Sequence, residues 1–467
     1  MSKIDFTSDD VHKNLMRFSV PMLFLSMLDY LGLFVNLGWL MVMSQEQHLP
    51  SVFRLSASVV GVLEAGFGGL LSAVYIYANQ AFGRKDHTVA RHLISFGFGL
   101  SIIIGVLIAL SGGLLGQQLL SAFGVESGIK LQVSRYLDVL WYGYLAVIVH
   151  IYAGLIAKMA GDTGLITRFR VTTFLCNLLL TPLFILYAQA RGLDVIQATA
   201  VAMILARLGG LAILGYQLRR GQVFPYSLGV DFLPRRVFTE WRALTKLAAA
   251  ETINGFSLTL SFFLFFVIVS YYEAGTLAAV TVSQYVTGFV QTVMIGTVAA
   301  LIPFTAQNAG NRNIVNIGKG VRWMTNRVLI ICLGISIPYV LLAPYFVGLF
   351  SPGDPVMAAH TLSYIRITTL PWAFLIASFP FIFAIVGLGD TRGTLLLTIW
   401  SMYLGNLLPM VIVLHWVGNT ITHAAYAEAG AHLLTFFGCM AYYRYREKQL
   451  SQSWQASMPV QVAGATA

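Results

Sequence analysis

Apolar runs of 20 or more residues recur along this chain, and they constrain its fold more than any other feature. As a helix, each run is long enough to cross the ~30 Å hydrocarbon core of a bilayer. The composition agrees, since 57% of the residues are hydrophobic and only 10% are charged, unlike a soluble globular domain. The runs lie near residues 15–43, 54–79, 92–120, 135–157, 169–190, 196–217, 244–271, 277–305, 321–350, 360–386, 394–416 and 421–443. The sequence predicts an all-α membrane protein with twelve transmembrane helices.

Two short motifs occur twice, in the same order and at nearly the same spacing. A Gln-x-x-Gly turn begins at Gln80 and again at Gln307, and a Gly-Asp-Thr turn begins at Gly161 and again at Gly389. The repeats predict two related halves, a first lobe over 1–217 and a second over 244–446. Six spans per half is an even number, so both lobes enter the membrane from the same side and form parallel repeats. We expect a binding site between the two lobes.

The basic residues predict the orientation of the chain. Of the 29 Lys and Arg residues, 23 fall in segments on the side of Met1 and 5 on the other side. Because Lys and Arg concentrate in cytoplasmic loops, both termini are expected in the cytoplasm, with the protein in the inner membrane. The net charge of +10 is explained by contact with anionic membrane lipid and requires no nucleic-acid partner.

Two polar segments flank the second lobe. Residues 218–243 link the lobes, and apolar side chains from Phe232 to Leu244 recur there at helical spacing between basic residues. The pattern favours a helix lying in the membrane interface, and a solvated tether is the alternative. Residues 447–467 are polar, rich in small residues and without period, so we expect a disordered cytoplasmic tail.

Ionisable residues within spans are costly and are therefore the first candidates for function. Asp29 lies in the middle of the first span, Glu64 in the second and Glu251 in the seventh. Asp29 and Asn36 are seven residues apart, nearly two helical turns, so they share one face. The alternative is that Asp29 lines a wet vestibule or pairs with a basic residue. The repeat places Glu64 opposite Gln291, so a titratable group in one half faces a neutral amide in the other.

The remaining polar residues give weaker signals. Asn177, Thr181 and Thr199 could join helices by hydrogen bonds. Glu428 is expected near the outer interface, and His432, without a metal-ligand partner, is expected to have a packing or interface role. The three cysteines are isolated within spans and predict neither a disulfide nor a metal site. We expect no cofactor besides a coupling ion, and Glu251, Asn254 and Gln291 are the candidates for a substrate cavity.

The paired turns, with Asn177-x-x-x-Thr181-Pro182 in span five and Ala198-Thr199 in span six, resemble the multidrug and toxic compound extrusion (MATE) family from Pro21 to about Tyr443. The resemblance implies a V-shaped exporter of two six-helix lobes. It also implies antiport: outward movement of amphipathic, often cationic organic molecules coupled to inward Na⁺ or H⁺.

The chain departs from the family pattern at two acidic positions. Where members typically carry an aspartate fifteen residues after the proline of span one, this chain has Asn36. Where they often carry another, four residues after Asn177, it has Thr181. Our hypothesis is that Asp29 and Glu64 supply the displaced charge. The expected cation-coupling residues are Asp29, Asn36, Glu64, Asn177, Thr181 and Thr199.

The prediction is a monomeric, non-enzymatic antiporter for bulky organic molecules. One alternative is a dedicated exporter of a natural product, such as a siderophore or a peptide-polyketide. Another is a flippase for lipid-linked oligosaccharides, which Arg207 disfavours by being the single basic residue well inside a predicted span. A channel or a membrane-embedded enzyme has no supporting motif.

Overall fold

The computed structural model describes residues 4–44, 49–122, 127–220, 224, 228–232, 241–273, 276–350 and 355–456. Most of these residues are helical, and none of them lies in a strand. The first lobe comprises α1 (Val11–Met43), α2 (Leu49–Gly83), α3 (His87–Ala122), α4 (Ser127–Tyr142), α5 (Tyr144–Met159), α6 (Thr163–Arg191) and α7 (Val195–Arg219). The second comprises α8 (Trp241–Ser270), α9 (Thr276–Val298), α10 (Leu301–Gly310), α11 (Ile314–Phe350), α12 (Pro355–Gly387), α13 (Thr391–Thr398), the π-helix η2 (Ile399–Leu407), α14 (Leu408–Trp416) and α15 (Ile421–Ala456).

Each predicted span corresponds to one helix or to consecutive helices. Within the described ranges, nine helices are long and apolar enough to cross a membrane, or ten if α4 and α5, bent by 66°, count as one span. The outer surface carries large exposed apolar side chains such as Leu110 and Leu341, as expected where helices face lipid. A helix suits this environment because it satisfies its backbone hydrogen bonds internally. The predicted fold of twelve spans in two lobes is confirmed.

The turns of the two lobes have matching backbone conformations. Lys85 and Arg312 have positive φ angles of 62° and 54°, and Gly161 and Gly389 have 65° and 70°. Each pair occupies equivalent positions of the sequence repeat. The duplication in sequence is therefore also a duplication of local structure.

The Gly-Asp-Thr motif owes its recurrence to helix capping. Gly161 and Gly389 take the left-handed conformation after α5 and α12, which glycine adopts without steric cost. The carboxylates of Asp162 and Asp390 then accept hydrogen bonds at 3.0 and 3.1 Å from the backbone N–H three residues later. Each motif thus ends one helix and begins the next.

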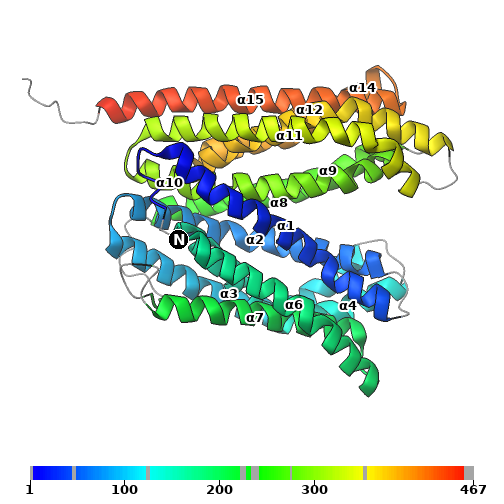
Figure 1. Cartoon of the computed structure of the whole chain (residues 1–467), viewed down its shortest axis with the longest axis horizontal. Coiled ribbons are helices and arrows are strands. Elements are labelled where there is room, and N and C mark those ends of the chain that lie inside the picture. Colours follow the sequence, from blue (N-terminus) through cyan, green and yellow to red (C-terminus); the bar gives the residue numbers. More distant parts are fainter. Residues whose placement is uncertain are drawn as a thin grey trace, which may run out of the picture.

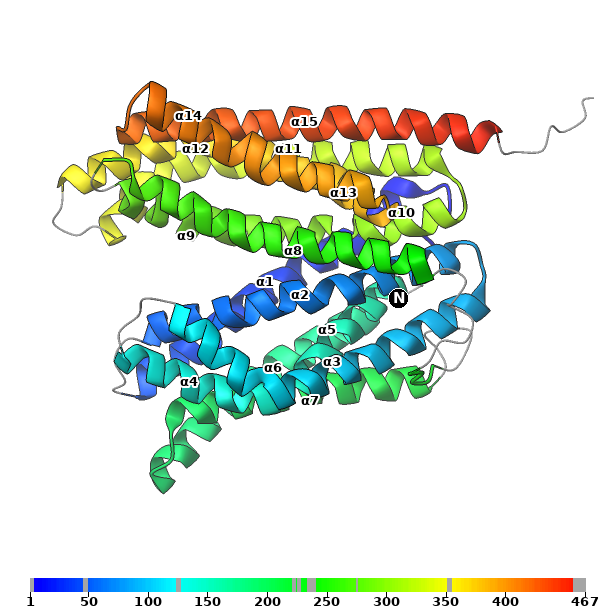
Figure 2. The ribbon, with the colours of Figure 1, turned by 180° about the vertical axis from the view of Figure 1, so that it is seen from behind.

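The two lobes lie close together at one end and diverge toward the other (Figure 1). α2 packs against α8 and α10, and α1 packs against α9. The N-terminus, α10 and the C-terminal end of α15 lie toward the close end, which we call the terminal end. The view from behind shows the same arrangement (Figure 2).

The end of the chain differs from the sequence prediction. α15 continues to Ala456, so the expectation of disorder from residue 447 is wrong for 447–456. Two long-range ion pairs lie where this extension begins: Glu447 pairs with Arg322 of α11 at 3.4 Å, and Arg446 pairs with Asp390 at 2.6 Å. These partners are more than 50 residues away in sequence, so local composition gave no sign of them. Residues 457–467 lie outside the described part.

The linker is described only in part. Residues 233–240, the centre of the predicted interfacial helix, lie outside the described residues. Trp241 and Leu244, expected in that helix, belong to the beginning of α8. Before the gap, residues 228–232 are not helical, and the backbone N–H of Asp231 donates to the carbonyl of Ser95 on α3 at 3.0 Å. This part of the linker is therefore attached to the first lobe.

Candidate functional site

Three polar side chains meet inside the first lobe. The Thr181 hydroxyl on α6 lies 2.9 Å from Oδ1 of Asn36 on α1 and 3.4 Å from Oδ1 of Asn177, one turn earlier on α6. All three residues are buried. Packing of α1 against α6 brings together residues 145 positions apart, and these three are among the residues expected at the coupling site. We call Asn36, Asn177 and Thr181 the first-lobe polar cluster.

The cluster contains more acceptors than donors at its centre. A threonine hydroxyl has one proton, so Thr181 donates to only one of the two amide oxygens at a time. The other oxygen then lacks this donor in a buried setting, where an unpaired polar atom is costly. Three oxygens converging in this way resemble the oxygen ligands that hard cations prefer.

Other predicted coupling residues do not join this cluster by a described hydrogen bond. Thr199 is buried on α7, but its hydroxyl donates to the carbonyl of Ile196 at 2.7 Å. Glu64 lies on α2, where the positive charge of Arg207 on α7 acts on its carboxyl group. Asp29 lies on α1 two turns before Asn36, and its side chain is outside the described part.

The predicted cavity residues lie on two helices of the second lobe. Glu251 is buried on α8, and its Oε1 has no hydrogen-bond partner within the described ranges. One turn later, Oδ1 of Asn254 accepts a hydrogen bond from the Thr398 hydroxyl of α13. Gln291 lies half-buried on α9. A buried carboxyl oxygen without a partner is unusual in a helix bundle and marks Glu251 as a functional candidate.

A second buried polar group was missed by the sequence reasoning. Tyr364 of α12 donates its hydroxyl proton to Glu428 of α15, and Nε2 of His432 lies 3.6 Å from the same carboxyl group. All three residues are buried, so the expectation that Glu428 is near an interface and that His432 has a packing or interface role was incomplete. The available signal was the spacing of four residues between Glu428 and His432, which places both on one helix face.

The repeated glutamines join the lobes at the terminal end. Nε2 of Gln80 donates to the carbonyl of Leu388 at 3.2 Å, and Nε2 of Gln307 donates to the carbonyl of Met159 at 3.2 Å. Gln80 of the first lobe therefore reaches the residue just after α12 of the second lobe. Gln307 of the second lobe reaches the last residue of α5 in the first lobe. The Gln-x-x-Gly motif is thus a paired contact between lobes.

Glycines let the two backbones approach at the same place. A Cβ at Gly83 would lie less than 3.0 Å from the backbone of Gln307, and one at Gly310 would lie less than 3.0 Å from the backbone of Gln80. Further along, Gly69 meets Thr252 of α8 and Gly296 meets Ser26 of α1 at similarly short range. We call these four glycine contacts, with the two glutamines, the inter-lobe seam.

The N-terminal residues also bridge the lobes. The backbone N–H of Ile4 donates to the carbonyl of Gly161 in the first lobe at 3.1 Å, and Nδ2 of Asn308 on α10 donates to the carbonyl of Phe6 at 2.7 Å. The buried Phe6 ring packs edge-on against Phe18 and Phe304. Residues 4–8, which we call the N-terminal strap, add to closure of the terminal end.

Comparison with known proteins agrees with this architecture. Multidrug export protein MepA of Staphylococcus aureus is 20% identical over 399 residues, covering 84% of this chain and 85% of MepA. Probable multidrug resistance protein YoeA of Bacillus subtilis is 21% identical over 383 residues, covering 78% of each. The bent form of the Vibrio cholerae MATE transporter VcmN superposes with a TM-score of 0.85 at 17% identity, over 96% of this chain and 99% of VcmN. The family model MatE matches residues 21–183 and 252–412, and this chain is therefore a multi-pass membrane protein of the MATE transporter family.

Proposed function

We propose that this MATE protein is a cation-coupled antiporter that exports bulky amphipathic organic molecules, many of them cationic. The names of the relatives support export of drugs: one is a multidrug export protein and another a probable multidrug resistance protein. The coupling ion is Na⁺ or H⁺. Cargo would bind between the lobes near the middle of the membrane, with Glu251, Asn254 and Gln291 on the second-lobe side.

The distribution of Lys and Arg supports placing the terminal end in the cytoplasm of the cell, at its inner membrane. In that orientation, the inter-lobe seam and the N-terminal strap close the cytoplasmic side. The lobes then diverge toward the outside, so this conformation is one from which cargo leaves. Return to the loading state would require the contacts of the seam to separate.

The buried first-lobe polar cluster is the observation that carries the proposal. Its three oxygens converge within hydrogen-bond range, and oxygen ligands are those that Na⁺ and similar hard ions prefer. The cluster itself has no formal charge, so a carboxylate is needed to favour a cation. We assign that role to Asp29, two turns away on α1, with Thr199 completing the site.

Glu64 is proposed as the second titratable group of this lobe. The neighbouring Arg207 charge would compete with a cation for the Glu64 carboxylate. Glu64 would therefore respond to the ion indirectly, by exchanging its interaction with Arg207 as the first-lobe helices rearrange.

One ion per cycle is energetically sufficient. A membrane potential of 100 mV acting on one charge supplies ~2.3 kcal/mol, which corresponds to a roughly fifty-fold bias in an equilibrium. The coupling requires that ion and cargo weaken the binding of each other.

The test is efflux of fluorescent organic cations from proteoliposomes under imposed Na⁺ or pH gradients. Thr181→Val removes one oxygen from the cluster with little change in shape and should abolish the dependence on the gradient. Thr292→Val is the matched control, because Thr292 is exposed on α9 and its hydroxyl donates to the carbonyl of Gly288 in its own helix. Equal gradient dependence in both variants would reject the cluster as the coupling site.

A second variant examines the negative charge. Asp29→Asn should abolish gradient-driven efflux while the protein remains at its normal level in the membrane. Undiminished transport by this variant would eliminate Asp29 as the coupling carboxylate, even if the Thr181→Val result supported the cluster.

A further inference from the structure

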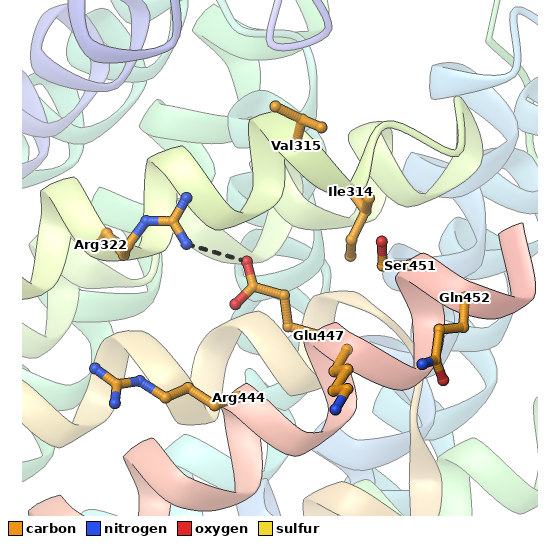
Figure 3. A pocket seen from close by; sticks show the side chains of 8 residues that line it. Ile314, Val315, Arg322, Arg444, Glu447, Ser451 and Gln452 are labelled. Atoms are coloured by element: carbon orange, nitrogen blue, oxygen red, sulfur yellow. Dashed lines mark hydrogen bonds and ion pairs between the residues drawn. The ribbon is translucent and has the colours of Figure 1, made fainter. Parts of the chain in front are cut away.

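A groove lies between α11 and the C-terminal extension of α15. Its volume is about 390 Å³, and its lining includes Arg322, Arg444, Glu447, Lys448, Ser451 and Ile314. Figure 3 shows Arg322 and Glu447 pointing toward each other across the two helices, with Arg444 on the same helix as Glu447. The groove is thus on the second lobe, apart from the first-lobe polar cluster.

The single carboxylate among these named residues is already engaged by α11. Glu447 pairs with Arg322 at 3.4 Å, and its side chain is 22% exposed while that of Arg322 is 63% exposed. A Cβ at Gly318 would overlap the Glu447 carboxylate, so the absence of a side chain at Gly318 makes room for this contact. Glu447 therefore serves mainly to hold the two helices together.

Two basic side chains remain available in the groove. Arg444 and Lys448 are exposed on α15, and neither forms an ion pair with a residue of the described ranges. With Arg322 and the single carboxylate, the four charged side chains leave a net charge of +2. Guanidinium and ammonium groups together suit phosphate, which Arg binds through paired N–H groups and Lys as a point charge.

We propose that this groove binds the phosphate headgroup of an anionic phospholipid from the cytoplasmic leaflet. The inference rests on the proposed cytoplasmic location of the terminal end. It does not depend on how transport is coupled to an ion. The groove lies where α11 and α15 reach that end of the molecule (Figure 1). Anionic lipids are concentrated in the cytoplasmic leaflet, where clustered basic residues attract them.

The apolar surface beside the groove favours a lipid over a soluble phosphate. Phe437 lies seven residues before Arg444 on α15, nearly two turns toward the membrane, and is 54% exposed. Ile330 lies eight residues after Arg322 on α11, also toward the membrane, and is 61% exposed. Acyl chains attached to a headgroup in the groove would cover such side chains, a contribution that a free anion cannot make.

The test is binding of phosphatidylglycerol to the purified full-length protein in detergent, measured by native mass spectrometry and by the shift in Tm. Phosphatidylcholine and free glycerol phosphate are the comparison ligands. Phosphatidylglycerol should bind more tightly than either and raise the Tm. The double variant Arg444→Gln/Lys448→Gln should weaken this binding by roughly thirtyfold, from the usual contribution of two basic residues near an anionic lipid.

The matched control is Lys13→Gln/Arg91→Gln, which removes the same charge from exposed positions near the beginnings of α1 and α3. Equal loss in both double variants would show a non-specific charge effect and overturn the proposal. Equal stabilisation by glycerol phosphate would identify a soluble-anion site and overturn the lipid assignment. Because binding is measured without transport, failure of the antiport proposal would leave this result unaffected.

Discussion

Gln307 donates a hydrogen bond from Nε2 to Oδ1 of Asn79 at 3.1 Å, and the two residues lie 228 positions apart. That separation is nearly the period of the sequence repeat. The bond therefore joins the corresponding C-terminal ends of α2 and α10 in the two lobes. The Gln-x-x-Gly motif, which shows the duplication in sequence, also supplies contacts that close the terminal end.

The first prediction concerns the close backbone approach in the inter-lobe seam. Gly310→Val places a side chain against the backbone of Gln80, and overpacking of this kind typically costs about 1–3 kcal/mol. The closed end should open more often, so hydrogen exchange in the N-terminal strap should accelerate roughly 5- to 150-fold. Gly215→Val is the control, because a Cβ at Gly215 meets no atom within 4 Å. The same exchange rate in both variants would contradict a gating role.

The second prediction separates cargo binding from ion coupling. Glu251→Gln keeps the shape of a buried carboxyl group and removes its ability to carry a negative charge. Because Glu251 is assigned to the cargo side, this change should weaken binding of a cationic cargo by more than it alters the ion concentration for half-maximal transport. Asp9→Asn, an exposed charge at the terminal end, should change neither quantity. The reverse ordering for Glu251→Gln would exchange the roles of the two lobes.

The third prediction concerns the hydrogen bond inside the second lobe. Tyr364→Phe removes the donor to the buried Glu428 carboxyl group, and an unsatisfied buried acceptor costs about 1–3 kcal/mol. The Tm of the purified protein should fall clearly. Tyr345→Phe is the control, since Tyr345 is 75% exposed on α11. Identical Tm values for the two variants would show that Tyr364 contributes no such bond.

The fourth prediction is a pH dependence at Glu447, beyond the membrane-spanning part of α15. Burial raises the pKa of this carboxyl, and Arg322 and Arg444 offset the effect only in part. The folded protein therefore retains this proton to a higher pH than the unfolded chain, whose pKa is about 4.3. The contribution of Glu447 to stability must then fall as pH rises through this window.

The measurement is the difference in Tm between wild type and Glu447→Gln. It is recorded at increasing pH, beginning at about pH 4. This difference should decrease with pH and level off above the raised pKa. Ser451→Ala, also in the groove, changes no titratable group, so its difference from wild type should stay constant. A difference for Glu447→Gln that grows with pH would contradict the assignment.

The sequence predicted the fold well because the signals for it are local. A run of apolar residues is sufficient to predict a membrane helix, and the turns at Gly161 and Gly389 were visible as repeats. The contact among Asn36, Asn177 and Thr181 was also expected, since the resemblance to the MATE family placed all three residues in one site.

Features that depend on distant partners could not be predicted in this way. The C-terminal part of α15 forms ion pairs with Arg322 and Asp390, both far from Glu447 and Arg446 in sequence. Likewise, the spacing of Glu428 and His432 was visible, but the approach of Tyr364 from α12 depends on tertiary packing. Such contacts combine residues whose individual sequence signals are weak.

The two-fold character of the inter-lobe seam has a consequence for how this protein can vary. Its glycine contacts occur in pairs at equivalent repeat positions, Gly83 with Gly310 and Gly69 with Gly296, much as in a homodimer folded from a single chain. Loss of one member leaves its counterpart in place. Single substitutions are therefore expected to change the lifetime of the closed state by small steps. A contact present on one side alone would be lost in a single step.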